Sequence, residues 1–277
     1  MPDPKSEREL AFIRDLLIAP DWGERFAELI DQHVKLPEKG RALYLNVGTG
    51  GHALALLEKA GHELSLLGLD ESNECLDLAQ AKTATTKAAI IFKQQTGTWL
   101  QLEDDQFDLV LADGSLVATE ALPEMISESV RVARSGATIA FSLTTASSFG
   151  EFFSIYWEAL HNCGLLDHEH DAEELITELP TVTDMEEMAR CQGLEEVTSW
   201  TQLEEFDYKT GAAFIASPLI ADFLMPVWLR SLPEESMDRV IEEVARLIDE
   251  ERHNADFWLT VKATLVTGRK VDLPLAG

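Results

Sequence analysis

The segment Leu43-Tyr-Leu-Asn-Val-Gly48-Thr-Gly50-Gly51-His52 joins a run of strand-forming residues to a cluster of glycines. A helical pattern follows at once, over Ala53 to Lys59. Glycines at such a turn let the backbone pass close to a ligand, and the first turn of the helix offers unpaired N–H groups. The segment therefore predicts a strand, a tight turn and a helix that together form one side of a ligand site.

The alternation of strand and helix patterns continues on the carboxyl side of this segment. Such alternation indicates parallel strands joined by crossover helices, which is a doubly wound α/β fold of the Rossmann type. Two amphipathic helices are predicted before it, over 6–18 and 24–33. The strands are predicted over Leu43–Val47, Leu64–Leu69, Ala89–Lys93, Phe107–Ala112 and Ala137–Leu143, with helices over 53–59, 73–81 and 123–133.

The chain changes character after residue 143, where helical patterns rich in aromatic or acidic residues replace the regular alternation. Two late strand patterns, near 196–206 and 258–266, are expected to form an antiparallel pair that closes an otherwise mostly parallel sheet. We expect one domain in three parts: N-terminal helices over 1–40, a ligand-binding core over 41–145, and an elaboration over 146–277 that completes the sheet.

Fifty acidic and 22 basic residues give this chain of 277 residues a formal net charge of -28. Because a field of this sign repels nucleic acid backbones and anionic lipid surfaces, we expect a small-molecule substrate and no nucleic acid. The three cysteines are widely separated, which fits reduced thiols and a cytoplasmic location. The apolar stretch 212–229 is interrupted by Pro218, Asp222 and Pro226, so no membrane span is expected. The oligomeric state stays open.

Asp70 is the strongest single candidate for a ligand-binding side chain. It stands twenty residues after Gly50, at the carboxyl end of the second predicted strand. A carboxylate in this position can accept hydrogen bonds from both hydroxyls of a ribose. The alternative is a helix cap, since Ser72 follows and both residue types are favoured at the N-cap.

Further motifs follow in an order that resembles the class I S-adenosylmethionine-dependent methyltransferases, particularly the branch that includes quinone-biosynthesis enzymes. The resemblance covers about residues 40–145 and implies S-adenosylmethionine as the cofactor and a methyl-transfer activity. It rests on the glycine turn, on Gly68-Leu-Asp70-Glu-Ser72 followed by Leu76 and Ala79, on Phe107-Asp-Leu-Val110, and on Arg131-Val-Ala-Arg-Ser-Gly136.

The resemblance assigns roles by position. Gly48 and Gly50, with Thr49 between them, would approach the methionine and ribose parts, Asp70 would hold the ribose, and Glu71 would lie by the adenine. Ala112 and Asp113 would border the methionine moiety. The family usually has an acidic residue where Asn46 stands and a third glycine where His52 stands. The aspartate that normally receives the adenine amino group corresponds to Thr96, which Gly97 and Thr98 follow.

Methyl transfer from a sulfonium mainly requires in-line positioning of an acceptor, because the donor is already activated. The resemblance therefore implies no fixed catalytic residue, and the catalytic group stays unknown. If the acceptor must lose a proton, Asp113 is the nearest candidate base. Its alternative is a turn residue in the sequence Ala112-Asp-Gly-Ser115.

Aromatic residues at helical spacing after the fifth strand suggest where an acceptor could bind. Phe149, Phe152, Phe153, Tyr156 and Trp157 form such a patch, and Phe223 and Trp228 could face it across a cleft. Core packing is the alternative explanation. The pocket interpretation, with Phe149, Phe152, Tyr156 and Trp228 as substrate-binding residues, suggests an apolar or aromatic acceptor. The segment Asp167-His-Glu-His170-Asp is interpreted as a solvated loop, and no metal site is predicted.

Two other functions fit parts of the sequence. Gly48-x-Gly50-x-x-Ala53 together with Asp70 also satisfies the dinucleotide fingerprint of nicotinamide-dependent oxidoreductases. Such domains often begin at their first strand, whereas two helices precede it here. The other possibility is a binding or regulatory module that keeps the fold without catalysis, and Asn46 and Thr96 motivate it.

Overall fold

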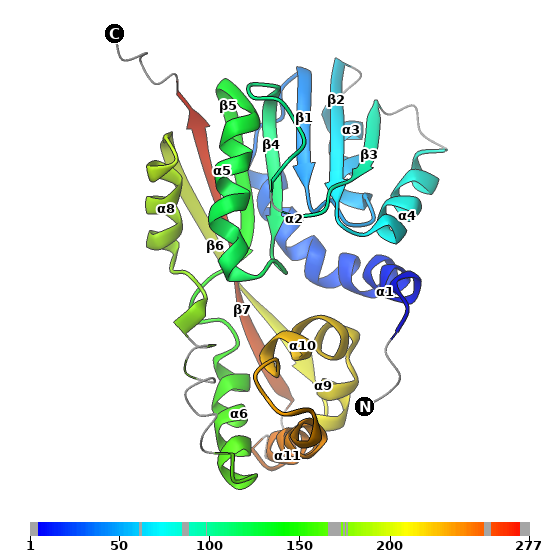
Figure 1. Cartoon of the computed structure of the whole chain (residues 1–277), viewed down its shortest axis with the longest axis vertical. Helices are drawn as coiled ribbons and strands as arrows, with labels where there is room; N and C mark the ends of the chain where they lie inside the picture. The colour runs from blue at the N-terminus through cyan, green and yellow to red at the C-terminus, as the bar shows by residue number, and fades with distance from the viewer. Residues whose placement is uncertain are drawn as a thin grey trace. The chain divides into compact units, whose positions relative to one another are not determined.

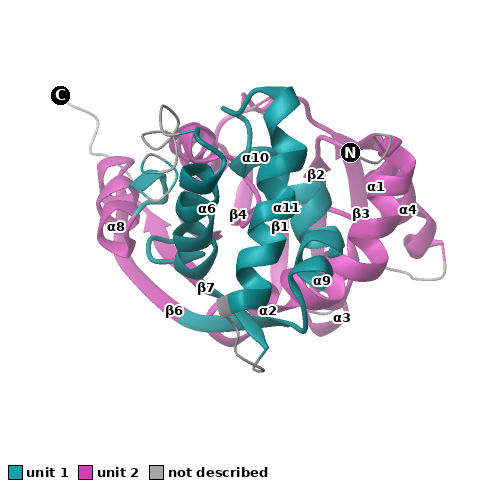
Figure 2. Ribbon diagram, turned by 90° about the horizontal axis from the view of Figure 1, so that it is seen from below, with its two compact units in different colours: residues 1–4, 144–180, 202–262 teal, residues 5–143, 181–201, 263–277 magenta. Residues whose placement is uncertain are grey.

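The computed structural model describes residues 5–60, 63–84, 89–97, 99–165, 173, 175, 177–251 and 256–271. Thr98 and the segment 167–171 therefore lie outside the described residues. The chain divides into two compact units, which are coloured separately in Figure 2. Unit 1 comprises residues 1–4, 144–180 and 202–262, and unit 2 comprises residues 5–143, 181–201 and 263–277.

The seven strands form one sheet in the order β3-β2-β1-β4-β5-β7-β6. The first five pair in parallel, and the sheet ends in an antiparallel pair, as the sequence predicted. Figure 1 shows β3, β2, β1 and β4 side by side with their carboxyl ends at the same edge. The strands are β1 Lys39–Leu45, β2 Glu63–Asp70, β3 Ile90–Gln94, β4 Phe107–Gly114, β5 Ala133–Thr144, β6 Leu194–Tyr208 and β7 Phe257–Lys270.

Strand β1 is central in unit 2 because it pairs with β2 on one side and β4 on the other. Its last four residues, 42–45, are all buried. A strand covered on both faces needs this continuous apolar run instead of an alternating one. Since β1, β2 and β4 are parallel, the residues that follow them meet at one edge of the sheet, where ligands bind in doubly wound folds.

Helices cover both faces of this sheet within unit 2. Helix α5 (Leu122–Val132) lies over β4 on one face, whereas α3 (Gly51–Ala60) lies on the opposite face (Figure 1). Helix α8 (Val182–Cys191) contributes Met185 and Ala189 to the same core as α5. Helix α4 (Asn73–Thr83) packs against β3 and begins at an N-cap serine, Ser72, whose hydroxyl accepts the Cys75 N–H at 3.2 Å.

The N-terminal part of the chain differs from its prediction. Instead of two helices with a break, it forms one continuous helical run: α1 (Glu7–Ile13), the π-helix η1 (Arg14–Gly23) and α2 (Glu24–His33). The wider π-helical turns include Pro20, which lacks the N–H that an α-helix would use. The run brings η1 and α2 over the carboxyl edge of the sheet in unit 2, where both contribute to a cavity.

Unit 1 contains α6 (Gly150–Asn162), the short helices α9 (Gly211–Ala216), η4 (Leu219–Leu224) and α10 (Met225–Trp228), and α11 (Glu234–Glu251). Helices α6 and α11 pack against each other, and Asn162 Nδ2 donates to Glu243 Oε1 at 2.8 Å (Figure 2). The apolar stretch 212–229 is thus divided among three short helices. Across the described residues, no helix is both long and apolar enough to cross a membrane.

A buried ion pair anchors the long connection between β3 and β4. Glu128 on α5 is 3% exposed and accepts the Leu100 N–H at 2.8 Å and the Arg131 guanidinium at 2.7 Å. Arg131 also donates to the carbonyl oxygens of Leu100 and Leu102. Burial opposes ionisation of Glu128, but Arg131 and the Leu100 N–H hold its pKa below the usual 4.5. The helix therefore fixes a connection that has no regular structure of its own.

We predict that Glu128→Gln lowers the free energy of unfolding at pH 7 by about 2–3 kcal/mol, because Arg131 loses its buried partner. Since the folded pKa of Glu128 is lowered, its contribution is present above the unfolded pKa and is lost as the pH falls through the folded value. The difference between the two proteins should therefore shrink below about pH 4. Urea denaturation across this pH range measures it. Glu124→Gln, at an exposed position of the same helix, is the control, and equal stability of Glu128→Gln and the native chain at pH 7 would contradict the prediction.

Candidate functional site

The turn after β1 depends on three residues with left-handed backbone conformations: Asn46 (φ 56°), Gly48 (φ 57°) and Gly50 (φ 74°). The two glycines serve different purposes. A Cβ on Gly50 would lie 2.8 Å from the Phe92 ring and from the Cβ of Ala79, so this glycine allows close packing. A Cβ on Gly48 would instead point towards the Arg14 guanidinium, 3.4 Å away. The open side of Gly48 therefore faces the cavity.

The carboxylate of Asp70 meets this turn, as the sequence led us to expect. Asp70 Oδ2 accepts the Gly48 N–H at 2.7 Å, and Oδ1 accepts the Ser72 N–H at 3.0 Å. Only 4% of Asp70 is exposed. Ser72, not Asp70, is the N-cap of α4. The capping alternative for Asp70 is therefore wrong, and its carboxylate joins the ends of two neighbouring strands.

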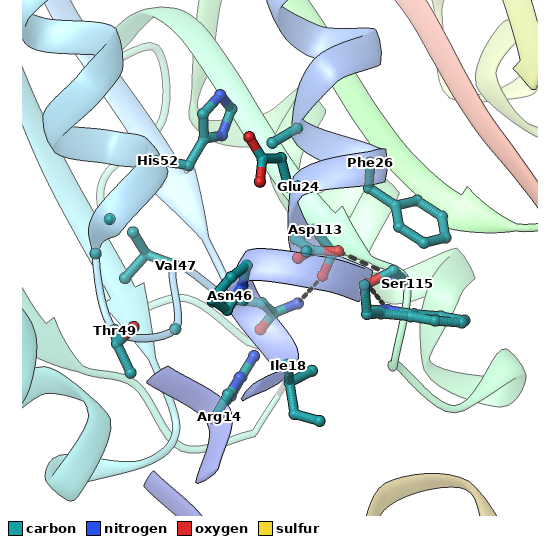
Figure 3. A pocket seen from close by; sticks show the side chains of 18 of the residues that line it. Arg14, Ile18, Glu24, Phe26, Asn46, Val47, Thr49, His52, Asp113 and Ser115 are labelled. Carbon is teal, nitrogen blue, oxygen red and sulfur yellow. Dashed lines mark hydrogen bonds between the residues drawn. The ribbon is translucent and has the colours of Figure 1, made fainter. Parts of the chain in front are cut away.

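A cavity of about 610 Å³ lies in unit 2 over the carboxyl ends of β1 and β4 (Figure 3). Its walls come from η1 and α2 on one side and from the glycine turn, the start of α3 and the end of β4 on the other. Five of the predicted cofactor residues line it: Asn46, Gly48, Thr49, Gly50 and Asp113.

Four other predicted cofactor residues, Asp70, Glu71, Thr96 and Gly97, are not among the residues that line this cavity. Glu71 is exposed, and its carbonyl oxygen accepts a hydrogen bond from Gln94 at 2.9 Å. Thr96 and Gly97 are exposed after β3, where the Gln95 side chain donates to the carbonyl of Thr96. Thr98 lies outside the described residues. The roles assigned to these residues by resemblance stay predictions.

Asn46 donates a hydrogen bond that an ionised acidic residue could not donate. Its Nδ2 donates to the carbonyl oxygen of Asp113 at 2.8 Å and lies 3.7 Å from Met125 Sδ. Ionised carboxylates only accept hydrogen bonds. Asparagine is also among the residues that tolerate a positive φ. The amide therefore links the turn after β1 to the end of β4 and contributes no charge to the cavity.

Two side chains of η1 reach the glycine turn, and no sequence pattern indicated either of them. The Arg14 guanidinium lies 3.6 Å from Asp70 Oδ1 and is about a quarter exposed. Asp15 accepts a hydrogen bond from Thr49 Oγ1 at 2.6 Å and forms an ion pair with Lys82. Figure 3 shows Arg14 and Thr49 on the same side of the cavity. The π-helix thus places one cation and one anion against the turn.

A second polar cluster joins β1, α2 and α3. Tyr44 Oη lies 2.9 Å from His52 Nδ1, and His52 Nε2 lies 3.4 Å from Asp31 Oδ1. Lys59 Nζ lies 2.5 Å from Asp31 Oδ2. Burial lowers the pKa of His52 below 6.5 despite the nearby charge of Asp31. Burial, with the charges of Asp113 and Asp31, raises the pKa of Tyr44 well above 10. Tyr44 is therefore a neutral phenol and His52 a neutral imidazole at pH 7.

The predicted substrate-binding aromatics lie in the interior of unit 1. Phe149, Phe152, Tyr156 and Trp228 are each at most 4% exposed. The rings of Phe152 and Trp228 stack with centroids 4.0 Å apart, and those of Phe152 and Tyr156 stack at 5.6 Å. This arrangement agrees with the core-packing alternative, and none of the four lines the cavity of unit 2. Their role in substrate binding stays a prediction.

Comparison with known proteins agrees with this fold. Residues 42–136 match the methyltransferase domain family. The demethylmenaquinone methyltransferase of Shouchella clausii is 30% identical over 117 residues, which are 42% of this chain and 50% of that protein. The ribosomal RNA small subunit methyltransferase H of Nitratidesulfovibrio vulgaris is 38% identical over 71 residues, 24% of this chain and 22% of that protein. The chain spans half or less of the length of these curated relatives.

Solved structures share the fold across most of the chain. The YcgJ protein of Bacillus subtilis superposes with a TM-score of 0.58 at 15% identity and covers 90% of this chain and 99% of its own. A phosphoethanolamine N-methyltransferase of Haemonchus contortus, solved with S-adenosylhomocysteine, gives a TM-score of 0.55 at 13% identity, with 97% and 61% coverage. The fold is thus that of the class I methyltransferases. Residues 42–136, which carry the glycine turn and Asp70, match the methyltransferase domain family.

We predict that Asn46→Asp lowers the free energy of unfolding by about 1–3 kcal/mol at pH 7, because the Asp113 carbonyl loses its donor. Below about pH 4 the new carboxyl group is protonated and can donate, so the loss should become smaller. Urea denaturation at both pH values measures the change. Asn73→Asp, at an exposed position in the first turn of α4, is the control, and unchanged stability of Asn46→Asp at pH 7 would show that the hydrogen bond has no importance.

Proposed function

We propose that this protein binds S-adenosylmethionine in the cavity of unit 2 and transfers its methyl group to a small molecule. The observation that carries the proposal is the 2.7 Å hydrogen bond from the Gly48 N–H to Asp70, because it brings the glycine turn and the carboxylate to one place beside the cavity. A ligand with a ribose and an amino-acid group can contact both. The family match over residues 42–136 supports the same cofactor.

The charges and hydrogen-bonding groups of the cavity fit the parts of S-adenosylmethionine. Asp70 has three donors within reach, from Gly48, Ser72 and Arg14, and a carboxylate offers about four acceptor sites. It can therefore still accept from a ribose hydroxyl. Arg14 provides a cation for the methionine carboxylate. The carbonyl oxygen of the Asn46 side chain provides an acceptor for the methionine ammonium.

When bound, the cofactor supplies an activated methyl group on a sulfonium. The chain then has to hold the donor and the acceptor in line and exclude water, since proximity and orientation account for most of the rate in such a reaction. The helical run η1–α2 forms one wall of the cavity and covers the glycine turn from the side opposite the sheet. It is therefore the element that we assign to water exclusion.

A small-molecule acceptor is part of the proposal. The cavity of about 610 Å³ has the size of a ligand pocket. The net charge of -28 opposes binding of nucleic acid backbones. One curated relative is named as a ribosomal RNA methyltransferase, but the match covers only 22% of that protein. Measuring methyl transfer to bulk RNA alongside small molecules would distinguish the two classes of acceptor.

The binding module without catalysis remains the second candidate, because Asn46 replaces the acidic residue that the family usually has. In the structure, Asn46 keeps the turn attached to β4, which preserves the shape of the cavity. We therefore propose that the exchange changes charge without dismantling the site. A chain that binds the cofactor but methylates no acceptor would support the second candidate.

We predict that Asp70→Asn weakens binding of S-adenosylmethionine by about 1.5–3 kcal/mol, or about 10- to 150-fold, because an amide has one acceptor oxygen in place of two and carries no charge. Isothermal titration calorimetry with S-adenosylmethionine and S-adenosylhomocysteine measures the change. Asp77→Asn, at an exposed position on α4, is the matched control. If Asp70→Asn is folded by circular dichroism and binds both ligands as the native chain does, Asp70 is not part of the cofactor site.

We predict that Arg14→Gln weakens S-adenosylmethionine and S-adenosylhomocysteine by about tenfold but leaves 5′-methylthioadenosine unaffected or bound more tightly. The first two ligands carry the carboxylate that Arg14 would pair with, whereas methylthioadenosine has none. Removing Arg14 also frees Asp70 from its ion pair. The same calorimetric titrations measure all three ligands. An equal loss of affinity for all of them would contradict this role for Arg14.

A further inference from the structure

Part of the cavity wall carries polar groups that cofactor binding does not use. Ser142 on β5 lines the cavity, is 1% exposed, and its hydroxyl has no hydrogen-bond partner in the described part of the chain. It pairs in the sheet with Asp113, which lines the same cavity. A buried hydroxyl without a partner is unfavourable by itself. Its position therefore indicates a ligand group that completes its hydrogen bonding.

The charge around this wall is negative. Asp15 and Asp31 are neutralised by Lys82 and Lys59. Glu24 and Asp113 also line the cavity, and within the described residues neither forms an ion pair with a lysine or arginine. Figure 3 shows Glu24 between His52 and Asp113. A carboxylate-bearing acceptor would be repelled here, whereas a protonated amine would be attracted.

We infer that this end of the cavity binds a primary or secondary amine, and that Tyr44, His52 and Asp31 form a relay that removes the amine's proton before methyl transfer. The inference rests on the proposed function, since it names the acceptor of that reaction. Apolar side chains of Ile18, Trp22 and Phe26 line the same cavity and would contact the organic part of the amine.

The relay has a defined direction. The contact with the Asp31 carboxylate favours the tautomer with the proton on His52 Nε2, which leaves Nδ1 to accept the Tyr44 hydroxyl proton. The ammonium gives one proton to Tyr44 Oη while the original Tyr44 proton moves to His52 Nδ1, which leaves an imidazolium beside Asp31. The amine lone pair then forms the new N–C bond as the C–S bond breaks, and the bonding pair stays on sulfur. The products are a methylated ammonium and a neutral thioether, and the proton on His52 leaves to solvent.

The same side chains also connect α2 with α3, so a purely structural role has to be separated from the relay. Tyr44→Phe removes one hydroxyl and keeps the ring, and His52→Gln keeps a hydrogen-bonding side chain without a titrating group. Asp31 keeps its ion pair with Lys59 in both variants. A structural role would change the melting temperature, whereas the relay changes kcat and its pH dependence.

The binding test uses the full chain saturated with S-adenosylhomocysteine. Calorimetry compares n-butylamine and 2-phenylethylamine with the alcohol and the carboxylate of the same carbon skeleton. We expect saturable binding of at least one amine and none of the carboxylates. Glu24→Gln, Asp113→Asn and Ser142→Ala should each weaken the amine about tenfold. Ser142→Ala should do so without lowering the melting temperature, because the hydroxyl it removes has no partner. Glu58→Gln, exposed on α3, is the control.

The kinetic test follows transfer of a radiolabelled methyl group to the amine that binds. Tyr44→Phe and His52→Gln should lower kcat by about 100-fold or more with little change in the KM of the amine. Burial lowers the pKa of His52, and the groups that face it are Tyr44, Glu24, Asp31, Lys59 and Asp113. The native rate should therefore fall as the pH drops through a value below 6.5, and His52→Gln should lack this step.

Two results would overturn the inference. One is binding of the carboxylates, or of no amine, by the chain saturated with S-adenosylhomocysteine. The other is an unchanged kcat and pH profile in both relay variants. Titration of S-adenosylmethionine into the same chain before S-adenosylhomocysteine is added separates the failures, because absence of that binding would contradict the proposed function itself. If the cofactor binds and every amine fails, only the acceptor assignment is wrong.

Discussion

The Asp70 carboxylate holds the site together because it accepts backbone N–H groups from two different connections. One comes from Gly48 in the turn after β1, and the other from Ser72 at the start of α4. Substituting Gly48 or Ser72 would keep the backbone N–H group of that residue. The shape of this edge of the sheet therefore depends on the acceptor, Asp70. Because Asp70 is 4% exposed, the charge would be unfavourable without these donors and Arg14. The geometry of the turn therefore depends on the Asp70 carboxylate, and a group that binds this carboxylate also acts on the turn.

The N-terminal helical run also contacts Asp70 and the glycine turn. Arg14 and Asp15 are consecutive residues of its π-helical section. Arg14 points towards Asp70, and Asp15 points towards Thr49. A ligand that approaches the Asp70 carboxylate meets the Arg14 guanidinium, and one that approaches the turn meets the Asp15–Lys82 ion pair. Charges of both signs therefore lie against the glycine turn. A zwitterionic ligand can replace both contacts at once, since it brings one partner for each sign.

The order of strands, the glycine turn and the position of Asp70 could be predicted because they depend on local patterns. The alternation of short apolar runs with helices identified the first five strands, and two separate late patterns identified the antiparallel pair. Parallel pairing then placed Asp70 at the edge where the turn lies. Contacts between distant segments left no such pattern. Nothing near Arg14 indicates that it lies 3.6 Å from a carboxylate 56 residues later in the chain.

The helical run through Pro20 was also missed, because a proline normally ends an α-helix and a π-helix has no separate sequence signal. His52 was noticed only as a missing glycine, although Tyr44 in the same segment is its partner. The division of the chain into domains and the role of the aromatic helix stay predictions.

Asn46 stands where the family usually has an acidic residue, and this difference in charge affects both the cofactor and the proposed amine acceptor. The methyl donor carries a sulfonium charge that the reaction removes from sulfur. The carboxylates of Glu24 and Asp113 line the cavity and form no ion pair with a lysine or arginine among the described residues. Beside them, loss of that positive charge is unfavourable unless another group takes it over. An amine does so, because the charge moves from sulfur to nitrogen and remains in the cavity, whereas an anionic acceptor would cancel it. A further carboxylate at position 46 would hold the charge more tightly at the donor and oppose its movement. The neutral amide of Asn46 links the turn to β4 by donating a hydrogen bond. Because it adds no charge, the negative charge of the cavity wall stays on the side where the amine is proposed to bind.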